Sequence, residues 1–315
     1  MEDCILIDWF QFSALISLED AFDLLGMWDG WELRLPSKLR YQFRAEKGRI
    51  SIHYTPENAP EKYNQGVCVE MTGQGCREYE TFGRADWYRL FQACITRDFN
   101  VTRLDLAFDD FSGVVPMSDV VQKAMFFHFV SLSKSVQILS DCSDGNPDHR
   151  GYSVYHGSRS SDVSIRIYDK RAERKRWDLE HWVRVELQLR HDAAHKVCTL
   201  IGSGQSVGDV FQGVLHHYLE YKNPSEDSNK SRWQPCTWYN DLVGTVSDIH
   251  LVSTRDVVYN QEKLYDYVIG QAGHAINCAR QVWGDKFQEY LADAAELPEK
   301  YKKLIAEASA AGIRE

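Results

Sequence analysis

Acidic, basic and tyrosine side chains alternate with apolar ones in four short segments of this sequence. The segments are VCVEMTG (67–73), VTRLDLAFDD (101–110), SIRIYDK (164–170) and VRVELQLR (183–190). Because alternate residues of a β-strand point to the same face, each segment predicts a strand with one apolar and one polar face. The polar faces together carry Glu70, Asp105, Asp109, Arg166, Tyr168, Arg184 and Glu186.

If the four strands share one sheet, the chemistry available to this polar face is phosphoryl transfer. Several carboxylates make a hard oxygen-donor site for Mg²⁺ or Mn²⁺, and such a metal polarises a phosphate oxygen. The predicted metal ligands are Asp105, Asp109, Glu186 and Glu70. A tyrosine oxygen can attack phosphorus and leave a phosphotyrosine with a free 3′ hydroxyl. We therefore predict Tyr168 as the nucleophile, with Arg166 and Lys170 as catalytic cations that lower the pKa of its phenol.

Each of these residues also has an ordinary structural interpretation. An antiparallel sheet commonly has one face in water, and a strand tyrosine is commonly half buried. Asp105 and Glu186 could simply pair with arginines of their own strands. Asp109 and Asp110 compete for the metal position, because either could cap a turn; the strand phase favours Asp109.

Basic residues gather around and after the predicted nucleophile. The predicted DNA-binding residues are Arg159, Arg171, Arg174, Lys175 and Arg184. The stretch 170–181 alternates in charge, so a solvated helix explains it as well as contact with DNA does. The loop 157–161 (GSRSS) resembles a phosphate-handling turn, with a hairpin turn as the alternative.

Composition limits the classes of protein that remain. The formal net charge of -10 counts against a protein that coats DNA non-specifically, but a site-specific enzyme needs only a local basic strip. The 8 cysteines contain no CxxC pair, which argues against a zinc site or a disulfide frame. No apolar run approaches the roughly 20 residues of a membrane span, and the N-terminus MEDCILIDWF is acidic where a signal peptide is basic. We expect a cytoplasmic protein that does not enter a membrane.

The order of predicted elements indicates an α+β fold, an antiparallel sheet with helices on one face followed by a helical C-terminal part. Further strands are predicted over 4–10, 40–45, 49–54 and 152–157, and helices over 17–25, 84–97, 118–132, 192–201 and 207–221. Residues 73–76 are interpreted as a tight connection and 140–151 as a polar loop. The predicted domains are a catalytic domain over 1–222, a linker or loop over 223–235, and a helical region over 236–315.

Several segments resemble one known family, the replication initiation factors of rolling-circle replicons, which includes initiators of plasmids and filamentous phages and related conjugative relaxases. The matching segments are VEMTGQGCREYE (69–80), VTRLDLAFDDFSG (101–113), YHGSRSSDVSIRIYDKRAE (155–173), WVRVELQLR (182–190), SRWQPCTWYNDL (231–242) and EKLYDYVIGQAG (262–273). The likeness runs from about residue 40 to residue 283, and the order and spacing of the motifs make it specific.

This resemblance implies metal-dependent nicking and rejoining of single-stranded or supercoiled origin DNA through a covalent phosphotyrosine. It places the nucleophile at Tyr168 and metal-binding acids at Asp105, Asp109 and Glu186, with Glu70 less firmly matched. The implied fold is a variant of the His-hydrophobic-His (HUH) nickase fold in which carboxylates replace the histidine pair. The implied partners are a host helicase and a second copy of the chain. Two other functions remain open at this point: a DNA-binding replication regulator that does not cut, and a metal nuclease that uses water.

Overall fold

The structure is a computed structural model, and it describes residues 2–35, 41–56, 59–60, 64–82, 86–142, 145–146, 149–158, 160–247 and 273–287. The chain divides into two compact units, Met1–Thr254 and Arg255–Glu315. The described part of the second unit contains the helices α10 (Gly273–Trp283) and η5 (Gly284–Lys286). The four segments with polar faces all lie in the first unit.

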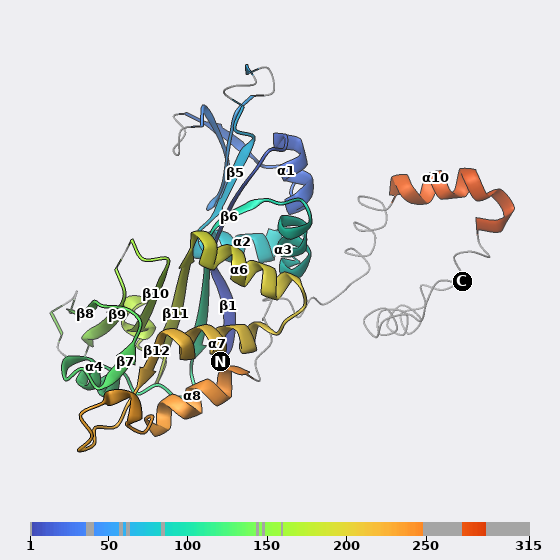
Figure 1. The fold of residues 1–315 in the computed structure, drawn as a ribbon. Helices are drawn as coiled ribbons and strands as arrows, with labels where there is room; N and C mark the ends of the chain where they lie inside the picture. The colour runs from blue at the N-terminus through green and yellow to red at the C-terminus, as the bar shows by residue number, and fades with distance from the viewer. Residues whose placement is uncertain are drawn as a thin grey trace, which may run out of the picture. The chain divides into compact units, whose positions relative to one another are not determined.

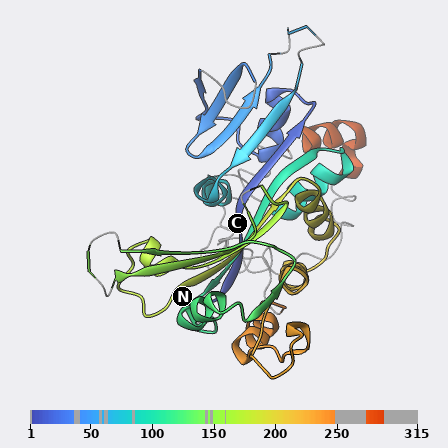
Figure 2. The same ribbon diagram turned by 60° about the vertical axis from the view of Figure 1, so that its left-hand side comes forward.

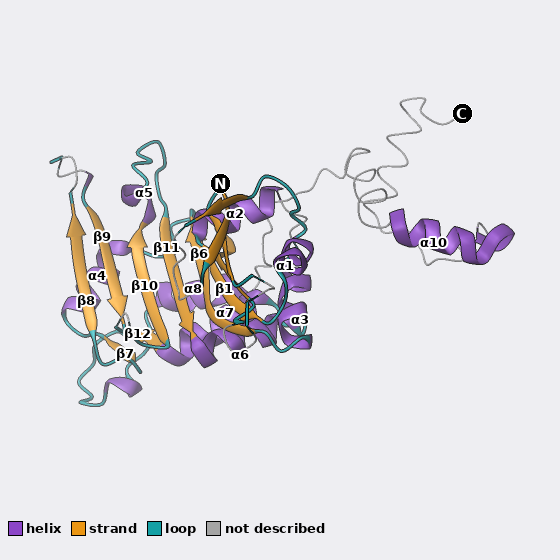
Figure 3. Cartoon of the chain, turned by 90° about the horizontal axis from the view of Figure 1, so that it is seen from above, coloured by secondary structure: helices purple, strands orange, loops and turns teal. Residues whose placement is uncertain are grey.

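Ten strands of the first unit form one sheet in which every pairing is antiparallel. In spatial order they are β2 (Glu32–Arg34), β3 (Phe43–Lys47), β4 (Ile50–Tyr54), β5 (Val67–Met71), β1 (Cys4–Ala14), β6 (Asn100–Asp110), β11 (Val183–Arg190), β10 (Val163–Asp169), β9 (Gly151–His156) and β8 (Val136–Asp141). Strands β8, β9, β10, β11 and β6 run side by side in Figure 3. Figure 2 shows the blue N-terminal strands turned away from the green ones, as expected from the twist of a large sheet.

Helices cover one face of this sheet (Figure 1). They are α1 (Leu18–Leu25), α3 (Trp87–Thr96), α4 (Met117–Met125), α6 (His191–Gly202) and α7 (Val207–Tyr218). On the outer side, α8 (Thr237–Ser247) packs against α7, and β7 (Phe129–Ser131) pairs with β12 (Leu219–Tyr221) in a separate small sheet. The predicted α+β fold, with an antiparallel sheet and helices on one face, is confirmed.

Large side chains from the strands and helices hold the two layers together. Phe10 of β1 is fully buried, and its ring centroid lies 5.0 Å from that of Phe91 and 5.9 Å from that of Trp87, both on α3. Aromatic side chains of this size bury roughly 150–250 Å² each, so these contacts contribute much of the packing free energy. The apolar residues predicted for the inner faces of β6, β10 and β11 all belong to this core.

The start of α1 follows the sequence prediction closely. The Ser17 hydroxyl accepts a hydrogen bond from the Asp20 backbone N–H, and the Asp20 carboxylate accepts one from the Ser17 N–H. This capping box satisfies two backbone donors that the first helical turn leaves free. The helix ends at Gly26, whose φ of 66° is readily available to glycine.

Strand β1 is longer than predicted and contains a β-bulge. Ile7 pairs with Leu106 and Trp9 pairs with Asp105, so Asp8 is the extra residue. A bulge places two successive residues against one residue of the partner strand. Cys4 and Leu6 therefore share a face with Trp9 and Gln11, although their numbers differ in parity.

Three other predicted elements also differ from the structure in their ends or type. Residues 73–76 begin the helix α2 (Gly73–Phe82), because the Thr72 side chain accepts a hydrogen bond from the Gly75 N–H at the helix start. Helix α4 ends at Met125, well before 132, because Phe127 is left-handed with a φ of 54° and its N–H bonds to the Ala124 carbonyl. The final residues of the predicted helix 207–221 form β12 instead.

Two further segments carry structure that the sequence pattern did not predict. Strand β8 fills part of the span between the predicted helix 118–132 and the polar loop 140–151, and pairs with β9 along its whole length. The segment 223–235 folds back on itself, with a β-bridge between Lys222 and Pro235 and a short helix η3 (Lys230–Arg232). The first compact unit continues through this segment and α8.

Within the part of the chain that the structure describes, none of the helices combines the length and the apolar character needed to cross a membrane.

Candidate active site

The register of the sheet brings the predicted polar faces together on the side opposite to the helices. Tyr168 of β10 pairs with Arg184 of β11, and Arg184 pairs with Asp109 of β6. One row along, Arg166 pairs with Glu186. Directly opposed residues in an antiparallel pair share a face, so these side chains lie on one surface of three adjacent strands. The four predicted strands share one sheet, in which β6, β11 and β10 are adjacent and β5 is separated from β6 by β1.

Tyr168 is buried between two cations. Its exposed fraction is 2%, the Arg166 guanidinium carbon lies 3.6 Å from its ring centroid, and the Lys170 Nζ lies 3.1 Å from its hydroxyl oxygen. Burial, followed by the nearby Glu186 carboxylate, raises the pKa of the Tyr168 phenol far above its usual range, against the opposing effect of Arg184 and Arg166. The hydroxyl therefore stays protonated until positive charge or a proton acceptor reaches it.

Lys170 connects the tyrosine to the edge of the site. Its Nζ lies 2.6 Å from a carboxylate oxygen of Glu173, whose side chain is 38% exposed. Burial, and next Arg184, lowers the pKa of Lys170, whereas Glu173 raises it. Lys170 follows directly after β10, as the first residue of the short helix α5 (Lys170–Glu173), and the Asp169 side chain caps that helix through the Ala172 N–H.

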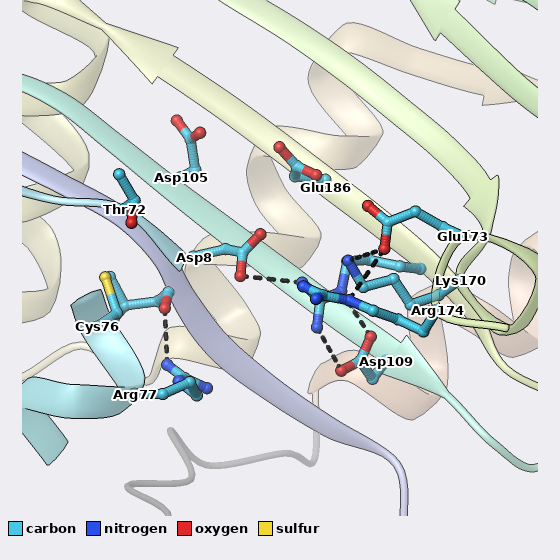
Figure 4. A network of polar contacts seen from close by, with 12 residues as sticks. Asp8, Thr72, Cys76, Arg77, Asp105, Asp109, Lys170, Glu173, Arg174 and Glu186 are labelled. Atoms are coloured by element: carbon cyan, nitrogen blue, oxygen red, sulfur yellow. Dashed lines mark hydrogen bonds and ion pairs between the residues drawn. The ribbon is translucent and has the colours of Figure 1, made fainter. Parts of the chain in front are cut away.

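Arg184 lies at the centre of a buried ion-pair network. Its Nε and one Nη donate to the two oxygens of Asp109, each at 2.7 Å, and its other Nη lies 2.9 Å from Asp8. The dashed lines at Asp8 and Asp109 in Figure 4 mark these contacts. All three guanidinium nitrogens are therefore occupied, and the side chain is only 6% exposed. This placement favours a structural role for Arg184 over the predicted contact with DNA.

Asp8 is a member of the site that the sequence prediction does not include. Within the strand predicted over 4–10, no partner for Asp8 is evident from the sequence. The bulge turns its carboxylate towards the polar face, where it meets Arg184. An acid inside an otherwise apolar strand is a signal that could have found it, because a buried carboxylate requires a partner.

Asp105 and Glu186 lie on the face outside the Arg184 network. Arg103 donates to Asp105 at 2.6 Å, and the side-chain amide of Gln188 donates to Glu186 at 2.7 Å. Burial raises the pKa of Asp105 to about 7; Arg103 opposes the shift and Glu186 adds to it. Figure 4 shows the two carboxylates on the same side of the strands.

The predicted metal ligands do not all meet. Glu70 pairs with Gln11, which pairs with Arg103, so Glu70 lies two strands away from β6 and in a different row from Asp105. Two strand spacings are about 10 Å. Among the described residues, no group of three or more His, Cys, Asp or Glu side chains is placed to hold a metal ion. Asp105 and Glu186 remain a pair of carboxylates that suits a divalent cation, since Mg²⁺ commonly takes one or two carboxylates and completes its shell with phosphate and water.

Asp110 points away from this face, which resolves the competition with Asp109. Its carboxylate accepts hydrogen bonds from the backbone N–H groups of Gly113, Val114 and Val115, and it lies 2.9 Å from His181 Nε2. Although burial opposes ionisation, the hydrogen bonds from His181 and Val115 lower the pKa of Asp110 overall. Asp110 is the turn cap that the sequence analysis considered as an alternative.

Replacing Asp110 with asparagine should destabilise the protein at pH 7 by about 1–2 kcal/mol, because a charge-assisted cap becomes a neutral one. A carboxyl whose folded pKa is lowered stabilises the protein above its unfolded pKa, and that contribution disappears as pH falls through the folded value. The difference between wild type and Asp110→Asn in urea unfolding should therefore shrink below about pH 4. A difference that stays constant from pH 7 to pH 3 would contradict this account.

The predicted DNA-binding residues occupy different environments. Arg171 donates to the carbonyls of Leu179 and Glu180 and so closes the loop after α5. Arg174 and Lys175 are exposed, and the Arg174 Nε lies 3.1 Å from Glu173. Arg159 lies outside the described residues. The exposed members are thus Arg174 and Lys175, next to the end of the strand that carries Tyr168.

Comparisons with known proteins show the family to which the chain is similar. Residues 99–294 match the sequence profile described as replication initiation factor, and residues 32–93 match that of the N-terminal domain of rolling circle replication initiation proteins. A protein of Bacillus subtilis (strain 168), provisionally named DNA relaxase NicK, is 26% identical over 270 residues, which cover 81% of this chain and 75% of that protein. A replication initiation protein of Staphylococcus aureus is 30% identical over 172 residues, which cover 51% of this chain and 48% of that protein.

A solved structure shares the fold. The rolling circle replication initiator protein from Geobacillus stearothermophilus superposes with a TM-score of 0.73 and 27% sequence identity, covering 80% of this chain and 99% of that chain. The replication initiation factor profile, over residues 99–294, spans β6, β10 and β11, the three strands whose polar face carries Tyr168. The chain therefore belongs to the replication initiation factor family, alongside rolling-circle initiators and relaxases.

Proposed function

We propose that this chain nicks and rejoins one strand of origin DNA, with Tyr168 as the nucleophile and a divalent cation as cofactor. The observation that carries the proposal is the environment of the Tyr168 hydroxyl. The hydroxyl oxygen lies 3.1 Å from Lys170 Nζ, and the Arg166 guanidinium lies over the Tyr168 ring. The side chain is on the same face as Asp105 and Glu186. A purely structural strand tyrosine has no need of two cations in a buried position.

The reaction exchanges one phosphodiester for another. A bond forms between the Tyr168 oxygen and phosphorus while the bond from phosphorus to the 3′ oxygen breaks, so the 5′ phosphate becomes attached to the enzyme. The phenolic proton leaves Tyr168 and the departing 3′ oxygen takes up a proton. Because the phosphotyrosine is still a phosphodiester, attack by a 3′ hydroxyl reverses the step and rejoins the strand.

Lys170 and Arg166 would act on the phenol and on the phosphate. Lys170 Nζ is the nearest nitrogen to the hydroxyl and can hydrogen-bond the developing phenolate. Arg166 makes a single hydrogen bond, to the Ser153 hydroxyl at 3.3 Å, and its Nε is buried without a partner among the described residues. An unpaired guanidinium nitrogen beside the nucleophile suits a phosphate oxygen.

Asp105 and Glu186 would hold the cation. When bound, Mg²⁺ or Mn²⁺ would polarise the scissile phosphate and neutralise the carboxylates. Neutralisation matters for the nucleophile, because the Glu186 charge is one of the causes that raise the Tyr168 pKa. Glu186 by itself thus disfavours the phenolate, and a cation bound to it would reduce that effect.

Saturating Mn²⁺ should raise the melting temperature of the wild-type protein, and Asp105→Asn and Glu186→Gln should each remove most of that rise. At a hundredfold excess over Kd, binding contributes about 2.7 kcal/mol to stability. Glu70→Gln is the matched control and should retain the rise, because Glu70 lies two strands from β6. Differential scanning fluorimetry with Mn²⁺ and with EDTA measures the shift. Equal shifts in all four proteins would count against the carboxylate pair as the site.

The reaction itself is tested on supercoiled plasmid that carries the genomic DNA surrounding the coding sequence. We expect open-circular product with Mn²⁺ and none with EDTA, with label from 5′ phosphate retained on the protein. Open-circular product without labelled protein would indicate a nuclease that uses water. Binding without any product, with metal present, would indicate a regulator that does not cut.

A further inference from the structure

Two arginines on adjacent strands lie on the same polar face as Tyr168, several residues further along the strands. Arg103 of β6 and Arg190 of β11 are directly opposed in register. Opposed residues have Cβ atoms about 4.5–5.5 Å apart, and like charges at that spacing destabilise a sheet. Burial, and next Arg103, lowers the pKa of Arg190, whereas the carboxylates of Asp105, Glu186 and Asp162 raise it.

Among the described residues, the hydrogen-bond partners of Arg190 are all neutral groups. Its nitrogens lie 3.4 Å from the Ser161 carbonyl, 3.5 Å from the Ser164 hydroxyl and 3.3 Å from the Gln188 side-chain oxygen. Among the described residues Arg190 forms no ion pair within 4.0 Å. A half-buried guanidinium with three long, neutral contacts has hydrogen-bonding capacity left for an anion.

Arg103 is held in place on the other side of the pair. Its Nε and one Nη donate to Asp105, and its guanidinium carbon lies 3.9 Å from the ring centroid of Trp9. The remaining Nη makes no hydrogen bond to the described residues, and the side chain is 23% exposed. The indole Nε1 of Trp9 is itself a buried donor without a partner among the described residues. Two donors, one on Arg103 and one on Trp9, are thus unused among the described residues.

We propose that Arg103 and Arg190 bind one phosphate of the substrate strand, at a subsite distinct from that of the scissile phosphate. A phosphodiester placed between them would turn a repulsive pair into two charge-assisted contacts. The inference rests on the proposed function for the identity of the strand, but its geometry is independent of Tyr168. It adds two residues that were not among the predicted DNA-binding set.

The spacing along β11 sets how far apart the two phosphates are. Arg184 lies in the row of Tyr168, and Arg190 lies six residues further along the same strand. At about 3.3 Å per residue the separation is about 20 Å. With a rise of 3.4 Å per nucleotide, roughly six stacked nucleotides would span it, and fewer if the strand is extended. A strand bound at both points would run parallel to β11 across the polar face.

Arg190→Gln should weaken binding of a labelled oligothymidylate by about tenfold, as expected for loss of one charge-assisted contact. The slope of log K against log salt should become less steep by about 0.7, the value for one phosphate of a single strand. Arg190→Lys, which keeps the positive charge, should have the wild-type slope of log K against log salt. Fluorescence anisotropy in EDTA measures binding without cleavage, and Arg89→Gln, which removes an exposed arginine from helix α3, is the matched control.

Thermal stability separates binding from folding. Since Arg190→Gln relieves like-charge repulsion, we expect its melting temperature to equal or exceed that of the wild type. Wild-type affinity and slope in Arg190→Gln would overturn the subsite, as would a fall in stability that accounts for weaker binding. If binding is unchanged but the covalent adduct still forms, the subsite fails and the proposed function stands. If binding weakens as predicted but no adduct forms in wild type, the subsite stands and the proposed function fails.

Discussion

Replacing Tyr168 with phenylalanine should abolish the covalent protein–DNA adduct and lower nicking by at least about 10⁴-fold, the scale on which enzymes lose turnover when a nucleophile is removed. The substitution deletes one oxygen and its hydrogen bond from Lys170. The ring would keep its position beneath Arg166, so the fold and DNA binding should change little. Incubation with end-labelled single-stranded DNA and Mn²⁺, followed by denaturing gel electrophoresis, measures the adduct.

Tyr155→Phe is the control for this experiment. Tyr155 pairs in register with Arg166 and lies on the same face of the adjacent strand β9. Its ring centroid is 5.2 Å from the Arg166 guanidinium carbon. It should keep nearly full activity, because no cation hydrogen-bonds its hydroxyl among the described residues. Peptide mapping of the adduct should identify Tyr168. Persistence of the adduct in Tyr168→Phe, or mapping to Tyr155, would remove Tyr168 as the nucleophile.

Replacing Arg184 with methionine should have the largest effect on stability, a loss of about 3–5 kcal/mol. Among the described residues, the guanidinium is the sole cation in contact with Asp109, and the Asp109 side chain is 4% exposed. Its removal leaves a buried carboxylate that must either stay charged without a partner or take up a proton. Loss of the Arg184 charge should destabilise the Asp8 carboxylate less, because the Asp8 side chain is 21% exposed and can be hydrated. The free energy of urea unfolding, followed by tryptophan fluorescence, measures the loss.

The double variant Arg184→Met with Asp109→Leu tests whether the unpaired Asp109 carboxylate causes the loss of stability. If the cost arises from an orphaned charge, removing that charge as well should recover most of the lost stability. The stability of Arg184→Lys should lie between those of the wild type and Arg184→Met, since an ammonium group keeps the charge but lacks the planar arrangement of donors. A loss below about 1 kcal/mol in the single variant, or no recovery in the double, would show that the network contributes little.

Local pattern was enough to place Tyr168, Arg166, Asp105 and Glu186 on one face. Strand alternation is a property of the backbone at each residue, so it can be read from a few neighbours in sequence. The pairing register of β10, β11 and β6 places these polar residues on one face, as the strand alternation predicts. The capping box of α1 was readable for the same reason, because its hydrogen bonds join residues three positions apart.

Pattern failed where the deciding contact came from elsewhere in the chain. Asp8 joins the site only through a bulge that depends on pairing with β6. Glu70 has the correct strand phase, yet the order of strands places it two positions from β6. The sequence shows Arg184 only as a basic residue on the face of Tyr168, whereas its partners Asp8 and Asp109 come from strands remote in sequence.

The sequence by itself determined the family, the fold class and which face of each strand could do chemistry, because motif order and period-two alternation are written along the chain. Only the tertiary structure decided which charges meet: the clamp of Asp8 and Asp109 on Arg184, the pair of Asp105 and Glu186, and the opposition of Arg103 and Arg190. Charges act through space over a few ångströms, so their partners depend on strand order and register, which no local stretch of sequence specifies.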